Sequence, residues 1–295
     1  MKYVICIVVA SLFSVTITTA RPKVGLVLSG GGAKGAAEVG ILKVIDKARK
    51  YGLEIDYIAG TSMGALIGGL YAAGISPDDI ERMMLTEKWL SLYSKDAVGY
   101  FSKNYWRAPT GLVRDDFLQN KLDSVFSSYG CRFFSDTMIP FNCVAVNINN
   151  MTEVYLKEGV LARSVVASMA YPGFLPIQQD GMNLIDGGVL NNLPVDVVRR
   201  MGADIVIAID LEQATKSTRN FSLKGTLGIG GIANWLVSRP DVKKRNENIK
   251  DANVYIHPNL TAFSIKDFEY SKLIRMIEIG EQEGNKFWNI LINLK

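Results

Sequence analysis

Short apolar runs alternate with helical patterns along the first quarter of the chain. Residues 23–29 have the pattern of a buried strand that ends in consecutive glycines, and a helical pattern follows. Residues 56–59 form a second short strand, which Gly60–Gly64 joins to an apolar helix that runs to Tyr71. Two strand–turn–helix units in succession predict a parallel sheet with crossover helices. The apolar positions of the first helix are Ala37, Ile41, Val44, Ile45 and Ala48.

The rest of the chain continues this mixture of strands and helices. Residues 212–222 are polar and residues 225–231 are glycine-rich, so both segments predict irregular structure. No internal repeat and no linker interrupts the pattern, which predicts a single α/β domain over residues 21–295, with a core at about 23–210 and a C-terminal extension at 211–295. The other expected strands are 141–147, 152–156, 183–185, 205–209 and 254–257, and the other expected helices are 160–170, 195–201 and 270–291.

The first twenty residues differ from the rest of the chain. A short positive start, Met1-Lys2, precedes a nearly unbroken apolar run, and small residues follow before Arg21. The run is shorter than the ~20 apolar residues that a membrane-spanning helix needs, so it predicts a cleaved signal peptide at residues 1–20. We therefore expect export to the periplasm, the outer membrane surface or the extracellular space.

Composition excludes some classes of function. The net charge is only +4, and the 33 basic residues form no block, so nothing favours nucleic-acid binding. The chain has one histidine and three cysteines without metal-ligand spacing, which makes a zinc site unexpected. Cys131 and Cys143 could pair after export, but the apolar run around Cys143 favours a buried free thiol.

The strongest chemical signal is the sequence Gly60-Thr61-Ser62-Met63-Gly64. It is a G-x-S-x-G motif between an expected strand and an expected helix, and a serine there lies on a tight turn with its hydroxyl exposed. The flanking glycines are needed because side chains would collide in so sharp a turn. The following helix N-terminus also favours negative charge near Ser62.

A second glycine-rich turn, Gly30–Gly35, also lies between a strand and a helix. Successive N–H groups at a helix start can hold the oxyanion of an acyl transfer. The spacing of Gly30, Gly32 and Gly35 also fits the dinucleotide fingerprint G-x-G-x-x-G, with Glu54 and Asp56 downstream as candidate ribose ligands. The dinucleotide fingerprint has its acidic residue at the C-terminal end of the second strand, whereas here the acidic residues precede that strand.

A nucleophilic serine needs a base, and the sequence offers two candidates. If the base is a histidine, only His257 can serve, and the order Ser62, Asp186, His257 matches that of α/β-hydrolases. However, the glycine-rich turn and the serine follow the first two strands after the expected signal peptide. The α/β-hydrolase fold places them later in the chain. His257 also ends an apolar run beside Pro258, which is typical of a structural histidine.

The other candidate base is Asp186, which lies in the sequence Ile185-Asp186-Gly187-Gly188. A carboxylate can take the proton of a serine hydroxyl and later return it to the leaving group. Its ordinary pKa of about 3.9 is low for this task, so a partly desolvated site must raise it. Asp-Gly is also a common turn sequence, and the residues alone leave the choice of base open.

Together these segments resemble the patatin-like phospholipases, a family of lipid acyl hydrolases with a Ser-Asp dyad. Gly30–Gly35 is similar to the family's oxyanion loop, Gly60–Gly64 to its nucleophile elbow, and Asp186–Gly188 to its dyad motif. Residues 167–176 and 188–195 continue the likeness, which covers about 23–209. Lys34 stands where the family often has arginine, which keeps the charge but loses a planar donor.

The resemblance implies a layered α/β fold with a mostly parallel central sheet flanked by helices, and catalysis without metal or other cofactor. Phospholipids or related lipid esters would be the substrates. Ser62 would attack the ester carbonyl and Asp186 would act as its base. The implied oxyanion hole comprises Gly30, Gly31, Gly32, Lys34 and Gly35, the elbow glycines are Gly60 and Gly64, and the dyad loop contains Gly187 and Gly188.

Such an enzyme must reach a membrane, so we expect peripheral membrane contact. Aromatic residues mixed with basic ones over residues 89–106 suit either an interfacial lid or a cap packed on the core. The apolar residues 287–294 suit core, membrane or homodimer contact equally. Two other functional classes stay open: a catalytically silent lipid-binding or assembly module, and a Ser-Asp-His esterase that uses His257.

Overall fold

A computed structural model describes residues 21–86, 115–170, 176–213 and 242–294. The expected signal peptide, the aromatic segment 89–106 and the bend at 225–231 lie outside the described residues, as do residues 171–175 of the family-like segment 167–176. In the described part, the strands are β1 (Val24–Leu28), β2 (Tyr57–Thr61), β3 (Phe141–Asn147), β4 (Thr152–Leu156), β5 (Ile177–Gln179), β6 (Met182–Asp186), β7 (Ile205–Ile209) and β8 (Val254–Ile256).

Helices connect and follow these strands. The α-helices are α1 (Ala36–Arg49), α2 (Met63–Ala72), α3 (Pro77–Met84), α6 (Asp115–Ser128), α7 (Leu161–Ser168), α8 (Val195–Met201), α10 (Val242–Asp251), α11 (Tyr270–Lys286) and α12 (Trp288–Leu291). Short 3₁₀ turns are η1 (Gly32–Gly35), η3 (Phe134–Asp136) and η4 (Gly187–Val189). The last expected helix therefore divides at Phe287, whose backbone leaves the helical region.

The described strands form one sheet in the order β5-β6-β3-β2-β1-β7-β8, with β4 paired to β3. Strands β3, β2, β1, β7 and β8 run parallel, while β4 and β6 pair antiparallel to β3 and β5 pairs antiparallel to β6. This confirms the expected α/β class with a mostly parallel sheet. Parallel strands need crossover connections, and the helices between them supply these.

One detail of this sheet places the site. Strand β4 occupies one edge of β3, so β2 and β6 share the other edge, end to end. Thr61, the last residue of β2, pairs with Val144, and Asp186, the last residue of β6, pairs with the next residue, Ala145. The C-terminal ends of two strands far apart in the sequence therefore meet at one point of β3.

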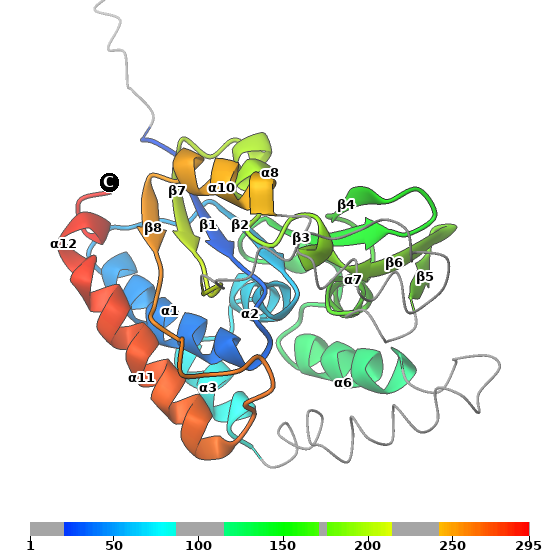
Figure 1. Cartoon of the computed structure of the whole chain (residues 1–295), viewed down its shortest axis with the longest axis horizontal. Coiled ribbons are helices and arrows are strands. Elements are labelled where there is room, and N and C mark those ends of the chain that lie inside the picture. The colour runs from blue at the N-terminus through cyan, green and yellow to red at the C-terminus, as the bar shows by residue number, and fades with distance from the viewer. Residues whose placement is uncertain (1–20, 87–114, 171–175, 214–241, 295) are drawn as a thin grey trace, which may run out of the picture.

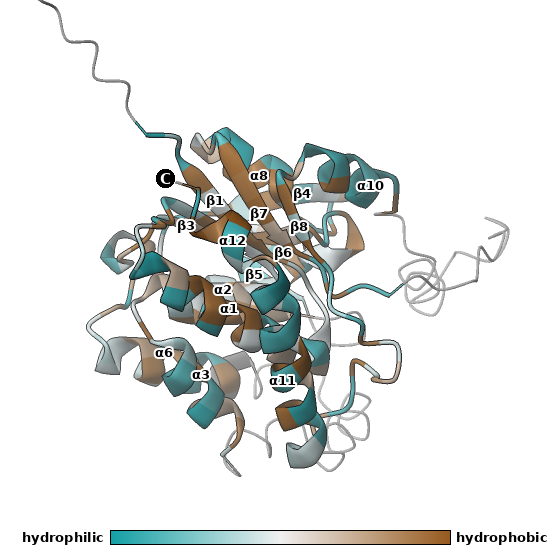
Figure 2. Ribbon diagram, turned by 90° about the vertical axis from the view of Figure 1, so that its left-hand side faces the viewer, coloured by the Kyte–Doolittle hydropathy of each residue, from teal (hydrophilic) through white to brown (hydrophobic). Residues whose placement is uncertain are grey.

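Helices cover both faces of the sheet (Figure 1). Leu26 and Leu28 of β1 face the larger apolar cluster, which includes residues of α1, α2, α3, α6, α7 and α11. The alternate residue Val27 faces a smaller cluster with α8 and α10. Successive side chains of a strand point to opposite faces, so a strand buried on both faces reads as a continuous apolar run. Figure 2 accordingly shows the central strands in the hydrophobic colour.

Helix α11 packs closely along α1, which ties the C-terminal part of the chain to its beginning (Figure 1). A Cβ at Gly40 would lie 2.0 Å from the Ile277 carbonyl oxygen, and a Cβ at Gly280 would lie 1.9 Å from that of Ala37. Only glycine allows backbones so close. Residues 242–294 thus add β8 to the sheet and α11 to the larger core.

Cys131 and Cys143 are both buried free thiols. Burial raises the pKa of Cys131 to about 11 and raises that of Cys143 further. The interpretation of Cys143 as a buried thiol is therefore correct. Among the helices that the structure describes, none is both long and apolar enough to span a bilayer.

Candidate active site

Ser62 lies on a sharp turn between β2 and α2. Its backbone has φ 54° and ψ −121°, a positive φ that is unusual for a residue with a side chain. A Cβ at Gly60 would lie 2.3 Å from the Gly64 carbonyl oxygen, and a Cβ at Gly64 would lie 2.4 Å from that of Leu28. Both positions therefore require glycine, as the motif predicted, and the turn leaves Ser62 partly exposed above buried neighbours.

The Ser62 hydroxyl donates a hydrogen bond of 2.6 Å from Oγ to Oδ2 of Asp186. The other carboxylate oxygen, Oδ1, accepts from the backbone N–H of Gly188 at 2.8 Å. Strand β6 ends at Asp186 and η4 begins directly after it, so the sheet register described above brings the two side chains together. Gly187 is packed so closely on β3 that a Cβ would lie 2.3 Å from the Val144 carbonyl oxygen.

Asp186 is only 5% exposed, and its environment changes its acidity. Burial raises the pKa of Asp186 to about 6, against the smaller opposing effects of the bonds from Ser62 and Gly188. Both donors are neutral groups. The carboxylate thus has the elevated pKa that a general base for a serine hydroxyl needs.

Three further hydrogen bonds at and just beyond the end of α7 hold both residues in place. The Ser62 N–H donates to Ser168 Oγ at 3.0 Å, and Ser168 Oγ–H donates to the Val144 carbonyl at 2.6 Å. Two residues later, the Ala170 carbonyl accepts from the Asp186 N–H at 2.9 Å. Sequence reasoning gave Ser168 no role, although a polar residue at the end of a largely apolar helix was a usable signal.

The glycine-rich loop lies directly beside Ser62, but its members differ in their contacts. A Cβ at Gly30 would lie 3.1 Å from Ser62 Cβ, while the Gly30 N–H itself donates to the Asn192 carbonyl. In the part of the chain that the structure describes, the N–H groups of Gly31 and Gly32 donate to no protein acceptor. These two N–H groups are therefore available to a ligand.

The remaining members of the loop have other contacts. A Cβ at Gly35 would lie 2.3 Å from Met63 Cγ, so Gly35 allows the close approach of α2. Lys34 is half-buried; burial lowers the pKa of its ammonium group, and the charges of Glu212 and Asp267 partly oppose this. Gly32 has φ 55° and lies against the Ile265 carbonyl, which accepts from the Ala33 N–H at 2.9 Å.

The structure places His257 away from this site. His257 follows β8, which lies three strand positions from β2, or about 14 Å at about 4.8 Å per strand. Its Nε2 lies 2.6 Å from the Glu212 carbonyl oxygen, and its ring stacks on that of Tyr255. Within the described chain, the partner of the Ser62 hydroxyl is the carboxylate, not the imidazole.

The acids of the dinucleotide alternative lie at the wrong end of the sheet. Asp56 directly precedes β2, whereas the glycine-rich loop follows the opposite, C-terminal end of β1. Its carboxylate accepts hydrogen bonds from Arg21, Lys23 and the Val24 N–H, and Glu54 pairs with Arg21. Both acids therefore form ion pairs with nearby basic side chains, which argues against a role in binding ribose.

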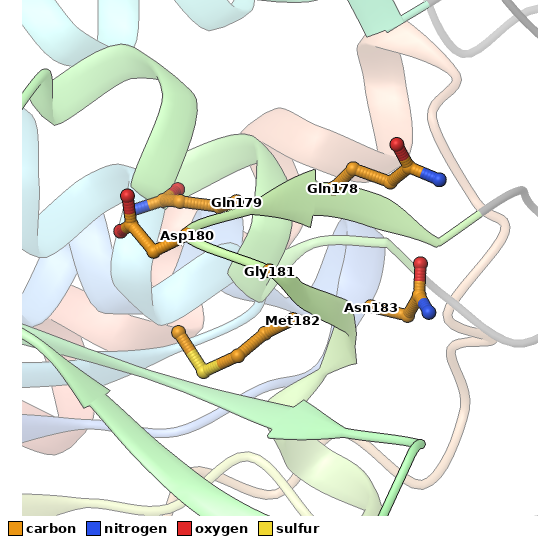
Figure 3. Close-up of a pocket in the computed structure, with 6 residues that line it drawn as sticks. All are labelled: Gln178, Gln179, Asp180, Gly181, Met182 and Asn183. Atoms are coloured by element: carbon orange, nitrogen blue, oxygen red, sulfur yellow. The ribbon is translucent and has the colours of Figure 1, made fainter.

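Two surface pockets are lined by neither Ser62 nor Asp186. One, of about 300 Å³, is lined by residues 178–183 around the β5–β6 turn, at the opposite end of β6 from Asp186 (Figure 3). The other, of about 570 Å³, is lined by residues of the segments 133–142 and 157–159. Among the described residues, no three histidine, cysteine or acidic side chains gather as a metal ion would require.

The family model "Patatin-like phospholipase" matches residues 26–199, which is more than half of the chain and includes the whole site. The chain belongs to the patatin-like phospholipase family. The matched range begins in β1 and ends in α8, and so contains the glycine-rich loop, the Ser62 turn and the Asp186 turn.

Curated relatives within this family align along most of the chain. The patatin-like phospholipase domain-containing protein ZK370.4 of Caenorhabditis elegans is 31% identical over 91% of this chain and 21% of its own length. The lysophospholipase nte1 of Aspergillus niger is 34% identical over 90% of this chain and 18% of its own length. The chain thus spans about a fifth of the length of these relatives.

A solved structure has the same fold. VipD from Legionella pneumophila superposes with a TM-score of 0.52 over 92% of this chain and 67% of the VipD chain, at 14% identity. At that identity the likeness concerns the fold alone. It agrees with the layered α/β architecture expected from the sequence.

Proposed function

We propose that this chain hydrolyses carboxylic esters of phospholipids or lysophospholipids, with Ser62 as nucleophile and Asp186 as its base. The observation that carries the proposal is the 2.6 Å hydrogen bond from the Ser62 hydroxyl to the buried Asp186 carboxylate, formed on a turn with positive φ. Membership of the patatin-like phospholipase family supports the substrate class, and the lysophospholipase nte1 of Aspergillus niger, a relative, adds lysophospholipids to it.

In the acylation step, Asp186 takes the proton of the Ser62 hydroxyl as Oγ forms a bond to the ester carbonyl carbon. The electron pair of the carbonyl moves to its oxygen, and the free N–H groups of Gly31 and Gly32 are the candidate donors to this oxyanion. Collapse of the intermediate breaks the bond to the leaving alkoxy oxygen, which takes the proton from Asp186. The products are an acyl ester on Ser62 and the deacylated lipid.

In the deacylation step, Asp186 removes a proton from water, and the hydroxide attacks the acyl carbon. The oxyanion forms in the same place, and its collapse expels Ser62 Oγ, which regains its proton from Asp186. The fatty acid leaves and the resting hydrogen bond is restored. A pKa of about 6 for Asp186 suits both halves of this cycle, since the base is ionised at neutral pH and still strong enough to accept a proton.

The test is fatty-acid release from mixed micelles of phosphatidylcholine and lysophosphatidylcholine, in the presence of a chelator. The variants are Ser62→Ala, Asp186→Asn and His257→Ala. We expect the first two to lose activity by about 10²- to 10⁴-fold and His257→Ala to retain it. Equal loss in His257→Ala would make histidine the base. Absence of release by the unsubstituted protein on any lipid ester would favour the silent lipid-binding module instead.

Export and membrane contact stay predictions. Export rests on the sequence of residues 1–20, and N-terminal sequencing of the protein from an exporting host tests it: we expect the mature chain to begin at Arg21. Membrane contact follows from the proposed substrate, and sedimentation with phospholipid vesicles tests it. A homodimer is tested by the mass of the purified protein in solution.

A further inference from the structure

Two consecutive asparagines follow the Asp186 turn, and they make different contacts. Asn192 is 8% exposed and forms a two-bond bridge to Gly30. Its carbonyl accepts from the Gly30 N–H at 3.2 Å, and its side-chain Nδ2 donates to the Gly30 carbonyl at 3.1 Å. Both polar groups of the Gly30 backbone are thereby satisfied by this one residue.

The Asn192 side chain lies between the two loops of the proposed site. A Cβ at Gly30 would lie 2.4 Å from Asn192 Oδ1 and 3.1 Å from Ser62 Cβ, and a Cβ at Gly188 would lie 2.8 Å from the same Oδ1. Gly188 in turn donates to Asp186. Asn192 therefore contacts the glycine-rich loop on one side and the Asp186 turn on the other.

We propose that Asn192 is a positioning residue, which sets the distance between the glycine-rich loop and the Ser62–Asp186 pair through its bridge to Gly30. Gly31 and Gly32, the candidate oxyanion donors, follow Gly30 directly, so a shift of Gly30 moves both N–H groups relative to Ser62. Asn192 does not touch the reacting atoms. This inference rests on the proposed function, because it needs the glycine-rich loop to hold the oxyanion.

The chemistry of the bridge explains the choice of an amide. The Gly30 carbonyl needs a donor, which the Asn192 Nδ2 supplies and an aspartate or alanine cannot supply. In Asn192→Asp, a carboxylate would face the Gly30 carbonyl and place a second negative charge near Asp186. Like charges disfavour ionisation, so we expect the pKa of Asp186 to rise in this variant.

Asn191 offers a matched control. It is also buried, at 1% exposed, and its Nδ2 donates to Asp196 at 2.8 Å and Glu153 at 3.2 Å. Its Oδ1 accepts from Asn248 of α10 at 3.2 Å. Its side-chain bonds therefore lead away from the glycine-rich loop. Its contact with the Ser62 turn is made by its backbone carbonyl, which accepts from Thr61 Oγ1.

The experiment measures kcat and KM on p-nitrophenyl butyrate for the full chain and for Asn192→Ala, Asn192→Ser, Asn192→Asp and Asn191→Ala. The rate of covalent labelling of Ser62 by a fluorophosphonate is measured alongside, since its phosphoryl oxygen occupies the oxyanion position. We expect kcat to fall by about 10- to 100-fold in the three Asn192 variants, with KM within about twofold and labelling slowed in parallel. In Asn192→Asp, the acid limb of the pH–kcat profile moves to higher pH.

We expect Asn191→Ala to lower the melting temperature while its folded molecules keep the original kcat. If Asn192→Ala does not fold, Asn192→Ser and Asn192→Asp provide the same comparison. The inference is wrong if the folded Asn192 variants keep kcat within twofold, or if Asn191→Ala loses as much kcat as they do. Failure of the unsubstituted protein to hydrolyse the ester or to be labelled would instead refute the proposed function, on which this inference depends.

Discussion

Strand β2 has an aspartate site at each end, and the two sites behave differently. At its start, Asp56 accepts hydrogen bonds from Arg21, Lys23 and the Val24 N–H. Burial alone would raise the pKa of Asp56, but the bonds from these cationic and backbone donors outweigh it and hold the pKa at about 2. At the other end, Asp186 meets the Ser62 hydroxyl without a cation, and its pKa is about 6.

The two sites differ both in the charge of their partners and in depth of burial. Asp56 is partly buried among cationic partners, whereas Asp186 is buried and has only neutral partners. Two cations fix Asp56 in the ionised form, in which it is too weak a base to take a proton. Neutral donors leave Asp186 basic enough to react. The comparison teaches that a buried carboxylate becomes a candidate base when its partners are polar but uncharged.

The largest expected effect is on turnover. We expect Asp186→Asn to reduce kcat on a phospholipid by about 10²- to 10⁴-fold, because the variant has no base, and Asp56→Asn to reduce kcat by less than about threefold. Fatty-acid release at pH 8 measures both, on protein shown to be folded by circular dichroism. A comparable loss of turnover in Asp56→Asn would remove the functional distinction between the two ends of β2.

The pH dependence of kcat/KM sharpens the same comparison. As the proposed base, Asp186 has to be deprotonated, so we expect the rate to rise with pH through about 6 and to level off above it. Below that pH, the rate should fall by about tenfold per pH unit. Rates on a neutral soluble ester between pH 4 and 8 give the profile. A profile whose rate rises through pH 4, with no inflection near pH 6, would contradict a raised pKa for the buried Asp186.

The next effect concerns the support of the Ser62 turn. Ser168→Ala leaves the Ser62 N–H and the Val144 carbonyl without their hydroxyl partner, so we expect a loss of stability of about 1–3 kcal/mol and a loss of kcat of about tenfold. Ser164, one turn earlier on α7, is the control. Its buried hydroxyl has no partner among the described residues, so its removal exposes no unpaired group, and Ser164→Ala should leave stability unchanged or raise it. Urea unfolding and fatty-acid release compare the two variants.

At the start of β2, we expect a stability effect instead of a catalytic one. The folded-state pKa of Asp56 lies below its unfolded value, so its ion pairs stabilise the protein above pH about 4, and this stabilisation is lost as pH falls through about 2. Asp56→Asn should therefore cost on the order of 2 kcal/mol at pH 7 and progressively less below pH 4. Urea unfolding at pH 7, 4 and 3 tests this; a constant difference would exclude the ion pairs as its source.

The smallest effect concerns a third buried carboxyl, Glu38 of α1. Burial raises its pKa well above the ordinary value, the nearby Ser29 N–H partly opposes this, and the charge of Asp210 adds to it. A raised folded-state pKa means that stability falls as pH rises above the unfolded value. Glu38→Gln removes this loss, so its stability relative to the original should increase between pH 5 and 8. An unchanged difference over that range would mean that Glu38 is ionised in the folded protein.

Most elements with apolar periodicity could be predicted from the sequence, but α3 and α6, which bury apolar residues at helical spacing, were not expected. The expected strands and the helices α1, α2, α7 and α8 are present close to their expected bounds. Helix α10 was not expected, because Asn248 is its one residue buried among those described, and Figure 2 shows it mostly in the hydrophilic colour. Its partners are Asp210, which directly follows β7, and Glu153 of β4, and no local pattern reveals these contacts.

The residues of the candidate site also fall into two groups, those recognisable from the sequence and those known only from their tertiary contacts. Ser62 and Asp186 stood in recognisable turns, and the structure brings them together, while their catalytic role stays a prediction. Ser168 and Asn192 meet Ser62 and Gly30 through tertiary hydrogen bonds. Both lie in family-like segments, and Ser168 ends a largely apolar helix, but no local pattern reveals these partners. Helix α3 is a different case: Ser76 caps it and Pro77 occupies its first turn, a start signal that was present in the sequence and was not used.

The end-to-end arrangement of β2 and β6 along β3 has a consequence for how the protein comes to be active. Ser62 and Asp186 are 124 residues apart, and they meet only after both strands have docked on the same edge of β3. Such non-local pairing forms late and slowly during folding. A nascent or partly refolded chain therefore carries the serine without its partner, and lipolytic activity should return with native tertiary structure, not with helix content. Under the proposed function, the chain gains hydrolytic activity only after Asp186 has been synthesised and both strands have docked on β3.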